Sequence, residues 1–186
     1  MKSLSLSQPH AIIMVGLPGS GKSFFAKRFA DTFNAPYISH DIILSLTSLD
    51  KKAVDALADY QLNELLKTKH SVVIEGGVST RAERTDIARK LRSEGYQPLF
   101  VWVQTDAETA KARSLKTKQH GEEEHEQLAR RFSAPHPSEK PIVISGKHTY
   151  ATQAKIILKR LSGPRAEIST HSSPPVRSLT DIRRSR

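Results

Sequence analysis

The chain has 186 residues, 37% hydrophobic and 26% charged, which fits one globular domain with a core large enough to need no cross-links. It contains no cysteine, which excludes disulfides and thiolate metal sites, and no apolar run approaches the roughly 20 residues that span a bilayer. The formal net charge of +10 suits polyanionic partners such as nucleotides or nucleic acid, and suits a solvated basic surface equally well.

The first half of the chain predicts a buried strand followed by an amphipathic helix. Residues 11–15 form a short apolar run closed by glycine, which is typical of a buried strand. A helix is expected over 21–33, where Phe25, Phe29 and Phe33 recur every four residues on one face. We interpret these rings as core rather than as a stacking surface for bases. The next expected elements are a strand over 36–39, a helix over about 50–68 and a strand over 71–75.

The second half continues the alternation of apolar strands and helices. The expected elements are a polar-faced helix over 80–94, a strand over 99–103, a helix capped by Asp106 that runs to about Lys116, a strand over 142–144 and a helix over 149–161. Five such strands indicate a parallel sheet with helices on both faces, which is an α/β fold arranged as a three-layer α/β/α sandwich.

The composition changes after the last expected helix. Residues 1–161 are expected to form the domain, whereas residues 162–186 are rich in Ser, Pro and Arg and are predicted to be disordered. The basic end of this tail could hold nucleic acid weakly through phosphates, or it could have no task. The N-terminal residues lack the apolar core of a signal peptide, so we expect a cytoplasmic protein with no membrane partner.

A phosphate-binding loop follows the first strand. Residues 16–23 read GLPGSGKS and satisfy the pattern G-x-x-x-x-G-K-[S/T] between a predicted strand and a predicted helix. Glycines let successive N–H groups converge on an anion at a helix N-terminus, Lys22 reaches the β- and γ-phosphates, and the Ser23 hydroxyl ligates Mg2+. The residues expected to contact nucleotide are Gly16, Leu17, Pro18, Gly19, Ser20, Gly21, Lys22 and Ser23. No N-K-x-D motif for guanine is present, which favours ATP.

Two carboxylates follow the next two strands. Ligands of open parallel sheets lie at the carboxyl ends of the strands, so Asp41 is placed to orient or deprotonate an acceptor hydroxyl. Asp41 would serve equally well as a helix N-cap. Glu75 closes the strand SVVIE and could hold Mg2+ through water; the alternative is a buried acid bonded to loop amides.

The chain resembles the AAA_33-type kinases in the order of four segments, which read GLPGSGKS, ISHD, VVIEGGVSTRAER and FVWVQTDAETAKAR. These are small P-loop NTPases related to polynucleotide 5′-hydroxyl kinase and, more distantly, to zeta-toxin-like kinases. The resemblance covers about residues 10–161. It implies that Asp41 is the base toward the acceptor, and it matches Arg84 to an arginine on the helix after the third strand. Polynucleotide kinases have arginines where this chain has His40 and Leu44.

A small helical lid is expected over about residues 114–134. Kinases of this architecture clamp the transferring phosphoryl group with lid cations, and Arg113 and Lys116 are the catalytic candidates here. Arg113 would also stack on adenine. Lys118, Arg130 and Arg131 are weaker candidates, and each of these cations could instead belong to a solvated helix face.

Two functions remain open from the sequence. The first is an ATP-dependent kinase that moves the γ-phosphate of Mg-ATP to a hydroxyl of a nucleic-acid 5′ end, a nucleoside or a small molecule. The second is an ATP-dependent binding module with weak ATPase activity that acts on RNA or a protein. It stays an alternative because Leu44 stands where polynucleotide kinases have an arginine. We expect the acceptor pocket between segments 41–60 and 76–85.

Overall fold

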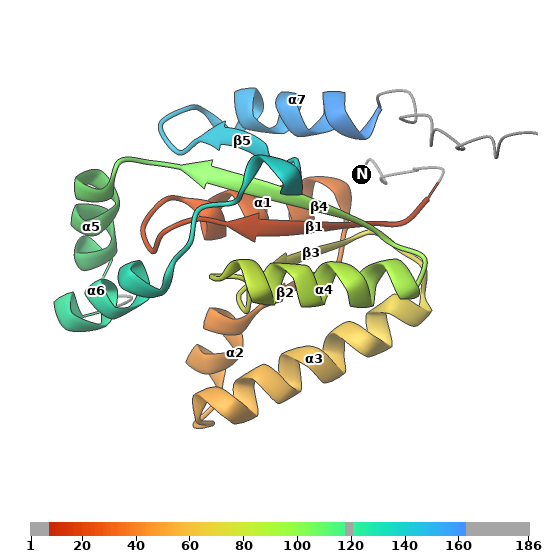
Figure 1. The fold of residues 1–186 in the computed structure, drawn as a ribbon, viewed down its shortest axis with the longest axis horizontal. Coiled ribbons are helices and arrows are strands. Elements are labelled where there is room, and N and C mark those ends of the chain that lie inside the picture. The colour runs from red at the N-terminus through yellow and green to blue at the C-terminus, as the bar shows by residue number, and fades with distance from the viewer. Residues whose placement is uncertain (1–7, 118–120, 163–186) are drawn as a thin grey trace, which may run out of the picture.

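The computed structural model describes residues 8–117 and 121–162 and places a five-stranded parallel sheet at their centre (Figure 1). The strand order is β2-β3-β1-β4-β5. The strands are β1 (His10–Val15), β2 (Tyr37–Ser39), β3 (Val72–Glu75), β4 (Gln97–Gln104) and β5 (Ile142–Ser145). All pairings are parallel, and the register sets Glu75 beside both Met14 and Ser39. The carboxyl ends of β1, β2 and β3 therefore meet at one edge.

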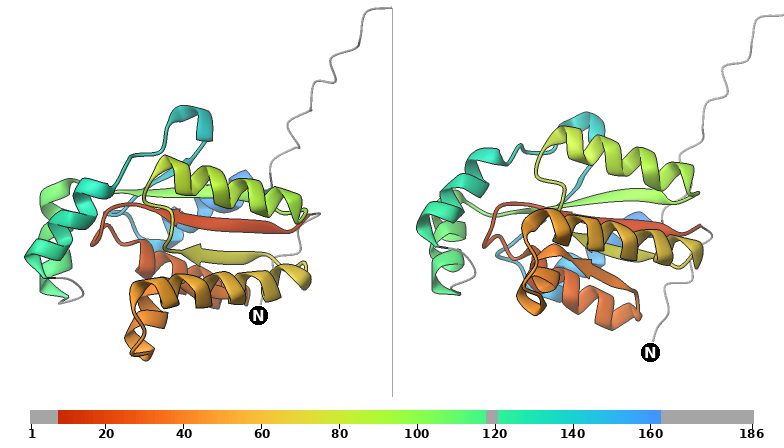
Figure 2. Two further views of the ribbon diagram at one scale, coloured as in Figure 1. Left: turned by 60° about the horizontal axis from the view of Figure 1, so that its bottom comes forward. Right: turned by 90° about the horizontal axis from the view of Figure 1, so that it is seen from below.

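Helices cover both faces of this sheet. They are α1 (Lys22–Phe33), α2 (His40–Leu46), α3 (Lys51–Lys67), α4 (Arg81–Ser93), α5 (Ala107–Lys116), α6 (Glu122–Arg131) and α7 (Tyr150–Leu161), with a short 3-10 turn η1 (Pro137–Glu139). Figure 2 shows α4 and α1 on opposite sides of the sheet. Helices α5 and α6 lie together beyond the carboxyl end of β4 (Figure 1). The expected α/β/α sandwich with a five-stranded parallel sheet is confirmed.

Alternation along β1 divides the core into two halves. Ile13 and Val15 pack with α3 and α4, whereas Ile12 and Met14 pack with α1 and α7. Phe25 belongs to the second half together with Phe29, and their ring centroids are 5.4 Å apart. The interpretation of these phenylalanines as core is therefore correct. Because β1 is buried on both faces, the loop that follows it leaves from a rigid support.

Two helices were not predicted as separate elements. Helix α2 begins immediately after β2, and the Ser39 hydroxyl caps it by accepting from the Ile42 amide at 3.4 Å. Helix α6 lies in the charged segment after α5, with Glu122 among the acids of its first turn and Arg131 in its last turn. That charge order stabilises a helix through its dipole.

The predicted tail, apart from Ser162, lies outside the described residues, as does Lys118. Among the helices that the structure describes, none combines the length and the apolar character needed to cross a bilayer.

Candidate active site

The GLPGSGKS segment forms the loop between the central strand β1 and helix α1. Gly19 has a φ of 78° and Gly21 a φ of 102°, in a region that side chains disfavour. A Cβ on Gly19 would lie 2.1 Å from the Ala110 carbonyl oxygen, so the loop rests directly against α5. Gly21 is the N-cap of α1, which places the turn at the positive end of the helix dipole.

The middle of the loop is closed by its own backbone and by a neighbouring segment. The Ser20 amide donates to the Leu17 carbonyl at 3.1 Å, and Pro18 between them is buried. The Ser20 carbonyl accepts from the Thr105 hydroxyl at 3.0 Å. A Cβ on Gly146 would lie 2.2 Å from the same carbonyl oxygen, so the β5–α7 connection also contacts the loop. The phosphate loop is therefore fixed from two sides.

Glu75 is the buried carboxylate of the site. It is 1% exposed at the end of β3 and accepts hydrogen bonds from the Ser23 hydroxyl at 2.6 Å and from the Tyr37 hydroxyl. The Lys22 ammonium lies 3.9 Å from it and also donates to the Leu17 carbonyl at 3.5 Å. Burial, then the charge and hydrogen bond of Glu75, raise the pKa of Tyr37, so the phenol remains a donor.

This arrangement fits Mg2+ bound with a nucleotide. A serine hydroxyl at the start of α1 and a carboxylate 2.6 Å away are the hard oxygen groups that Mg2+ takes, directly or through water. Ser23 and Glu75 would hold the ion on the side of the loop where Lys22 lies.

Asp41 is exposed in the first turn of α2, where Ser39 and not Asp41 is the N-cap. Helix α2 begins where β2 ends, and the negative charge of Asp41 is the weakest of the influences that raise the pKa of Tyr37. The structure thus brings Asp41 to the loop edge of the sheet without fixing its side chain to Glu75 or Lys22.

The lid cations differ in their surroundings. Arg113 on α5 donates to the Gly146 carbonyl at 3.0 Å, beside the phosphate loop. Lys116 lies exposed one turn further along α5. Arg130 pairs with Glu126 at 3.4 Å within α6, and Arg131 pairs with Glu83 on α4. Of these four cations, only Arg113 has a described contact with a segment that touches the loop.

Arg84 has a structural position rather than one facing a ligand. Its side chain is 0% exposed, and its Nε donates to Glu139 at 2.7 Å. The guanidinium also donates to the carbonyl oxygens of Val78, Ser79, Ser133 and Ala134. Burial alone would raise the pKa of Glu139, but the Arg84 hydrogen bonds and charge hold it below its usual value. Arg84 therefore fastens α4 to the segment after α6.

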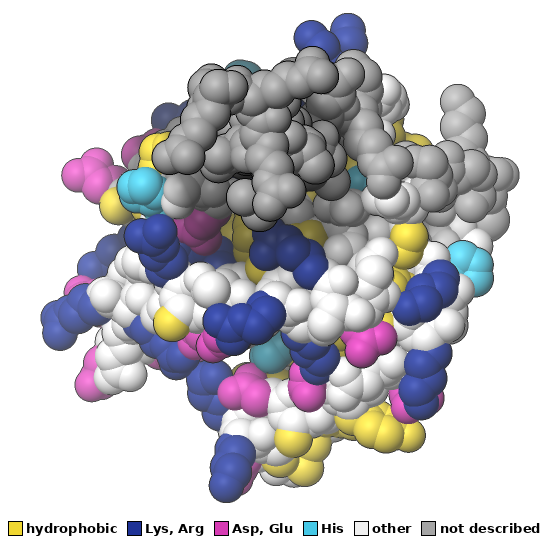
Figure 3. Space-filling model, turned by 45° about the vertical axis from the view of Figure 1, so that its right-hand side comes forward, with side chains coloured by type: hydrophobic (Ala, Val, Ile, Leu, Met, Phe, Trp, Pro, Cys, Tyr) yellow, Lys and Arg dark blue, Asp and Glu magenta, His cyan; other side chains and the backbone are white. Residues whose placement is uncertain are grey.

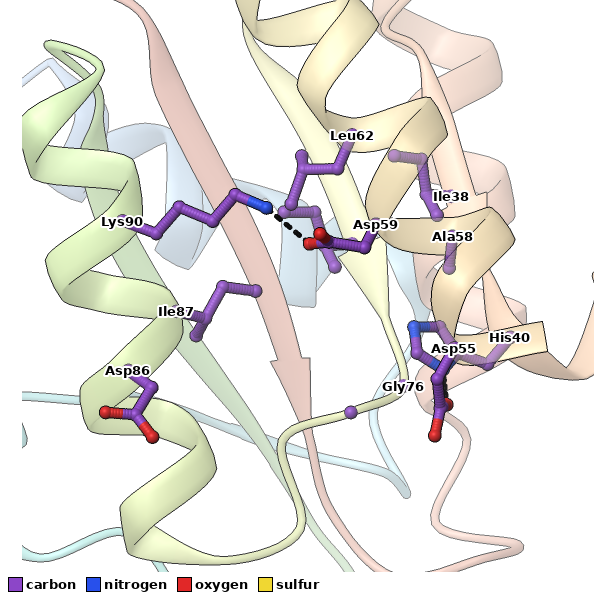
Figure 4. A pocket seen from close by; sticks show the side chains of 12 residues that line it. Ile38, His40, Asp55, Ala58, Asp59, Leu62, Gly76, Asp86, Ile87 and Lys90 are labelled. Atoms are coloured by element: carbon purple, nitrogen blue, oxygen red, sulfur yellow. Dashed lines mark hydrogen bonds and ion pairs between the residues drawn. The ribbon is translucent and has the colours of Figure 1, made fainter. Parts of the chain in front are cut away.

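A cleft of about 260 Å3 lies between α3 and α4, over the carboxyl-terminal parts of β2 and β3 (Figure 4). Gly76 and Gly77, which directly follow Glu75, line it. The His40 ring packs over these two glycines, because a Cβ on Gly76 would lie 2.5 Å from the ring. The His40 Nδ1 lies 2.9 Å from Asp55 on α3. The cleft falls where the acceptor pocket was expected, but Asp41 is not among its lining residues.

The surface charges do not form one basic patch on the face shown in Figure 3, where Lys and Arg side chains are mixed with Asp and Glu.

The fold and the loop together define a P-loop nucleotide-binding protein. The family model for an AAA domain, AAA_33, matches residues 12–135, and the chain belongs to this family. No curated protein is similar enough in sequence to match the chain.

Solved structures with the same fold include kinases. A gluconokinase from Sinorhizobium meliloti 1021 is 16% identical with a TM-score of 0.62, over 82% of this chain and 91% of that one. Chaetomium thermophilum Kti12 in complex with ADP-AlF3 is 16% identical with a TM-score of 0.65, over 82% and 100%. A chain of the Pnkp1/Rnl/Hen1 complex is 24% identical with a TM-score of 0.51, over 57% and 39%. At these identities the likeness concerns the fold.

Proposed function

We propose that the protein is an ATP-dependent kinase that transfers the γ-phosphoryl group of Mg-ATP to a hydroxyl group held in the cleft between α3 and α4. The observation that carries this proposal is the cluster of Lys22, Ser23 and Glu75 at the phosphate loop, with the cleft beginning at the residue after Glu75. Mg2+ bound there would neutralise charge on the β- and γ-phosphates.

The residues of the loop and of the sheet edge have separate roles in phosphoryl transfer. Loop amides around Gly19 and Gly21 hold the phosphates, and Lys22 stabilises the negative charge that develops on the phosphoryl group in the transition state. Asp41 accepts the proton of the acceptor hydroxyl as the new O–P bond forms and the bond to the β-phosphate breaks, releasing ADP. Asp41 directly follows His40, which lines the cleft, so the proposal places its carboxylate at the mouth of the cleft.

The lid would complete the site. Residues 1–161 act as the kinase domain in this proposal, with the lid over about 114–134. Arg113 and Lys116 are its cations, and Arg113 starts beside the loop through its bond to Gly146. Closure of these cations over the phosphates would exclude water and limit wasteful hydrolysis of ATP.

A labelled-ATP transfer screen tests the proposal. The acceptors are a 5′-hydroxyl oligonucleotide, nucleosides and small polyols. Lys22→Ala should lower turnover at least about 10²-fold, as expected when a main charge-stabilising group is lost. Lys27→Ala, an exposed lysine on the same helix, is the matched control and should leave turnover unchanged. Undiminished turnover in pure Lys22→Ala protein would reject the assignment.

Asp41→Asn separates the kinase from an ATP-dependent binding module acting on RNA or a protein. For a kinase, this substitution should reduce phosphoryl transfer about 10²- to 10⁴-fold while leaving Mg-ATP affinity near wild type. Asp31→Asn, an exposed acid on α1, is the control. Slow hydrolysis unaffected by Asp41→Asn, with no labelled acceptor, would favour the binding module.

A further inference from the structure

The cleft has an apolar floor and a polar rim. The floor consists of the aliphatic side chains of Ile38, Ala58, Leu62, Ile74 and Ile87, from both strands and both flanking helices. At about 260 Å3 the cleft suits a small molecule. Aliphatic surface of this kind packs against the C–H face of a sugar ring or a short carbon chain. The floor therefore supplies contact area, and the rim must decide which compounds fit.

The rim is acidic, although the whole chain has a net charge of +10. Its charged residues are three carboxylates, Asp55, Asp59 and Asp86, and one ammonium, Lys90. The lining residues therefore carry two more carboxylates than ammonium groups. Two of these carboxylates pair with cations that do not line the cleft: Lys51 lies 3.0 Å from Asp55, and Arg89 lies 3.0 Å from Asp86. Figure 4 shows Lys90 reaching across from α4 to Asp59 on α3, so the rim's lysine already has a carboxylate partner.

His40 adds a polar ring to this rim. Its Nδ1 lies 2.9 Å from Asp55 Oδ1, and a carboxylate can only accept, so the imidazole donates from Nδ1. In the neutral ring this leaves Nε2 as an acceptor. Asp55 takes a second bond from Lys51 at 3.0 Å, which gives its charge a partner that does not need a protonated His40. The rim thus presents acceptors for hydroxyl and amine hydrogens.

An anionic compound would find few partners in this cleft. It would have to displace Asp59 from Lys90, and it would then lie near Asp55 and Asp86. No arginine lines the cleft among the described residues, so the bidentate cation that best recognises carboxylates and phosphates is missing. A protonated amine would meet carboxylates that already have cationic partners. Lys51 and Arg89 are 67% and 74% exposed, and such exposed pairs are weak. A carboxylate has two oxygens that can accept further hydrogen bonds, so it can bind an amine beside such a partner.

We infer that the acceptor is a small hydroxyl compound that carries a protonated amine, such as an amino alcohol or an amino sugar, and not a sugar acid or a nucleic-acid 5′ end. This inference rests on the proposed kinase function, because it assumes that the cleft next to Glu75 receives the acceptor. The rim carboxylates determine specificity, and the apolar floor holds the carbon skeleton.

The test compares small hydroxyl compounds of similar size that differ in charge. Two series are suitable: glucosamine, glucose and glucuronate, and serinol, glycerol and glycerate. Binding to protein saturated with Mg-ADP is measured by calorimetry and saturation-transfer NMR, and transfer is measured with labelled ATP. In at least one series the amine should bind about tenfold more tightly than the neutral compound, with the acid weakest. A 5′-hydroxyl oligonucleotide should not accept phosphate.

Two opposite charge variants make the test specific to the cleft. Asp59→Asn frees Lys90 and should remove the preference for the amine, whereas Lys90→Gln frees Asp59 and should preserve or increase it. Asp86→Asn is a second acid variant in case Asp59→Asn fails to fold, and Asp31→Asn on α1 is the control that should change nothing.

The outcomes separate this inference from the kinase proposal. Failure of Mg-ADP to bind would reject the nucleotide site itself. Normal Mg-ADP binding with phosphoryl transfer to an acid, a neutral polyol or an oligonucleotide in preference to the amine would leave the kinase intact and overturn the inference. Binding of no amine in either series at millimolar concentration, or an unchanged preference in Asp59→Asn, would overturn it as well.

Discussion

Replacing Glu139 by glutamine tests how strongly the buried Arg84 holds the segment after α6. The substitution removes the charge that compensates a guanidinium with 0% exposure while keeping a side chain that can still accept hydrogen bonds. Removing one partner of a buried ion pair costs about 3–5 kcal/mol. Glu139 is 11% exposed and Arg84 keeps its carbonyl partners, so we expect about 2–3 kcal/mol.

Urea unfolding followed by far-UV circular dichroism measures this loss. A change of about 2–3 kcal/mol corresponds to a fall in the midpoint of about 1 M urea, because the slope for a domain of this size is about 2 kcal/mol/M. The control is Glu64→Gln, which breaks the exposed Lys67–Glu64 pair and should cost at most about 0.5 kcal/mol. Replacing both Arg84 and Glu139 by methionine should not recover the loss, because the carbonyl oxygens that accept from Arg84 would then lack a donor.

The same ion pair makes a stability prediction against pH. The pKa of Glu139 in the folded state is lowered from 4.5. The contribution of Glu139 to the free energy of unfolding is therefore complete above pH 4.5 and is lost as the pH falls through the folded-state pKa. The wild type should therefore lose stability more steeply than Glu139→Gln in acid. A urea midpoint in Glu139→Gln within about 0.2 M of wild type, or parallel acid profiles, would contradict the role given to this pair.

Gly19→Ala should abolish Mg-ADP binding in calorimetry, because the added Cβ would lie 2.1 Å from the Ala110 carbonyl oxygen. Gly95 has the same φ of 78° but open space around it, so Gly95→Ala should cost only about 1–2 kcal/mol of stability. Equal effects of the two would argue against close contact between the loop and α5. Glu75→Gln should raise the Mg2+ concentration for half-maximal turnover about 10- to 100-fold, and Tyr37→Phe should raise it less. An unchanged Mg2+ requirement in Glu75→Gln would remove this residue from the metal site.

The strands and the loop were predictable because each has a local signal. The apolar run 11–15 is short and closed by glycine, which is typical of a buried strand, and the GLPGSGKS pattern is specific to a loop between a strand and a helix. The Asp106 cap was predicted correctly and accepts from the Thr109 amide at 2.8 Å. Such features depend on residues within a few positions of one another, so one sequence contains all of the information needed.

Other features depend on partners far along the chain. Arg84 and Glu139 are 55 positions apart, and no spacing rule links them. Helix α2 was missed because the apolar residues of its segment IILSL follow one another closely and so surround the helix instead of forming one apolar stripe. Only Ile43 among them is buried. The partnership of Tyr37 with Glu75 follows from strand register, which the sequence alone does not reveal.

The match to the family model ends at residue 135, whereas the sheet continues beyond that residue. Strand β5 and helix α7 lie beyond that limit, and they cover one edge of β4 and part of the core around Phe25 and Phe29. A recombinant fragment cut at the family boundary would leave β4 with a bare edge and these rings facing water, which are conditions for aggregation. Expression and crystallisation work on this protein should therefore keep the chain through α7.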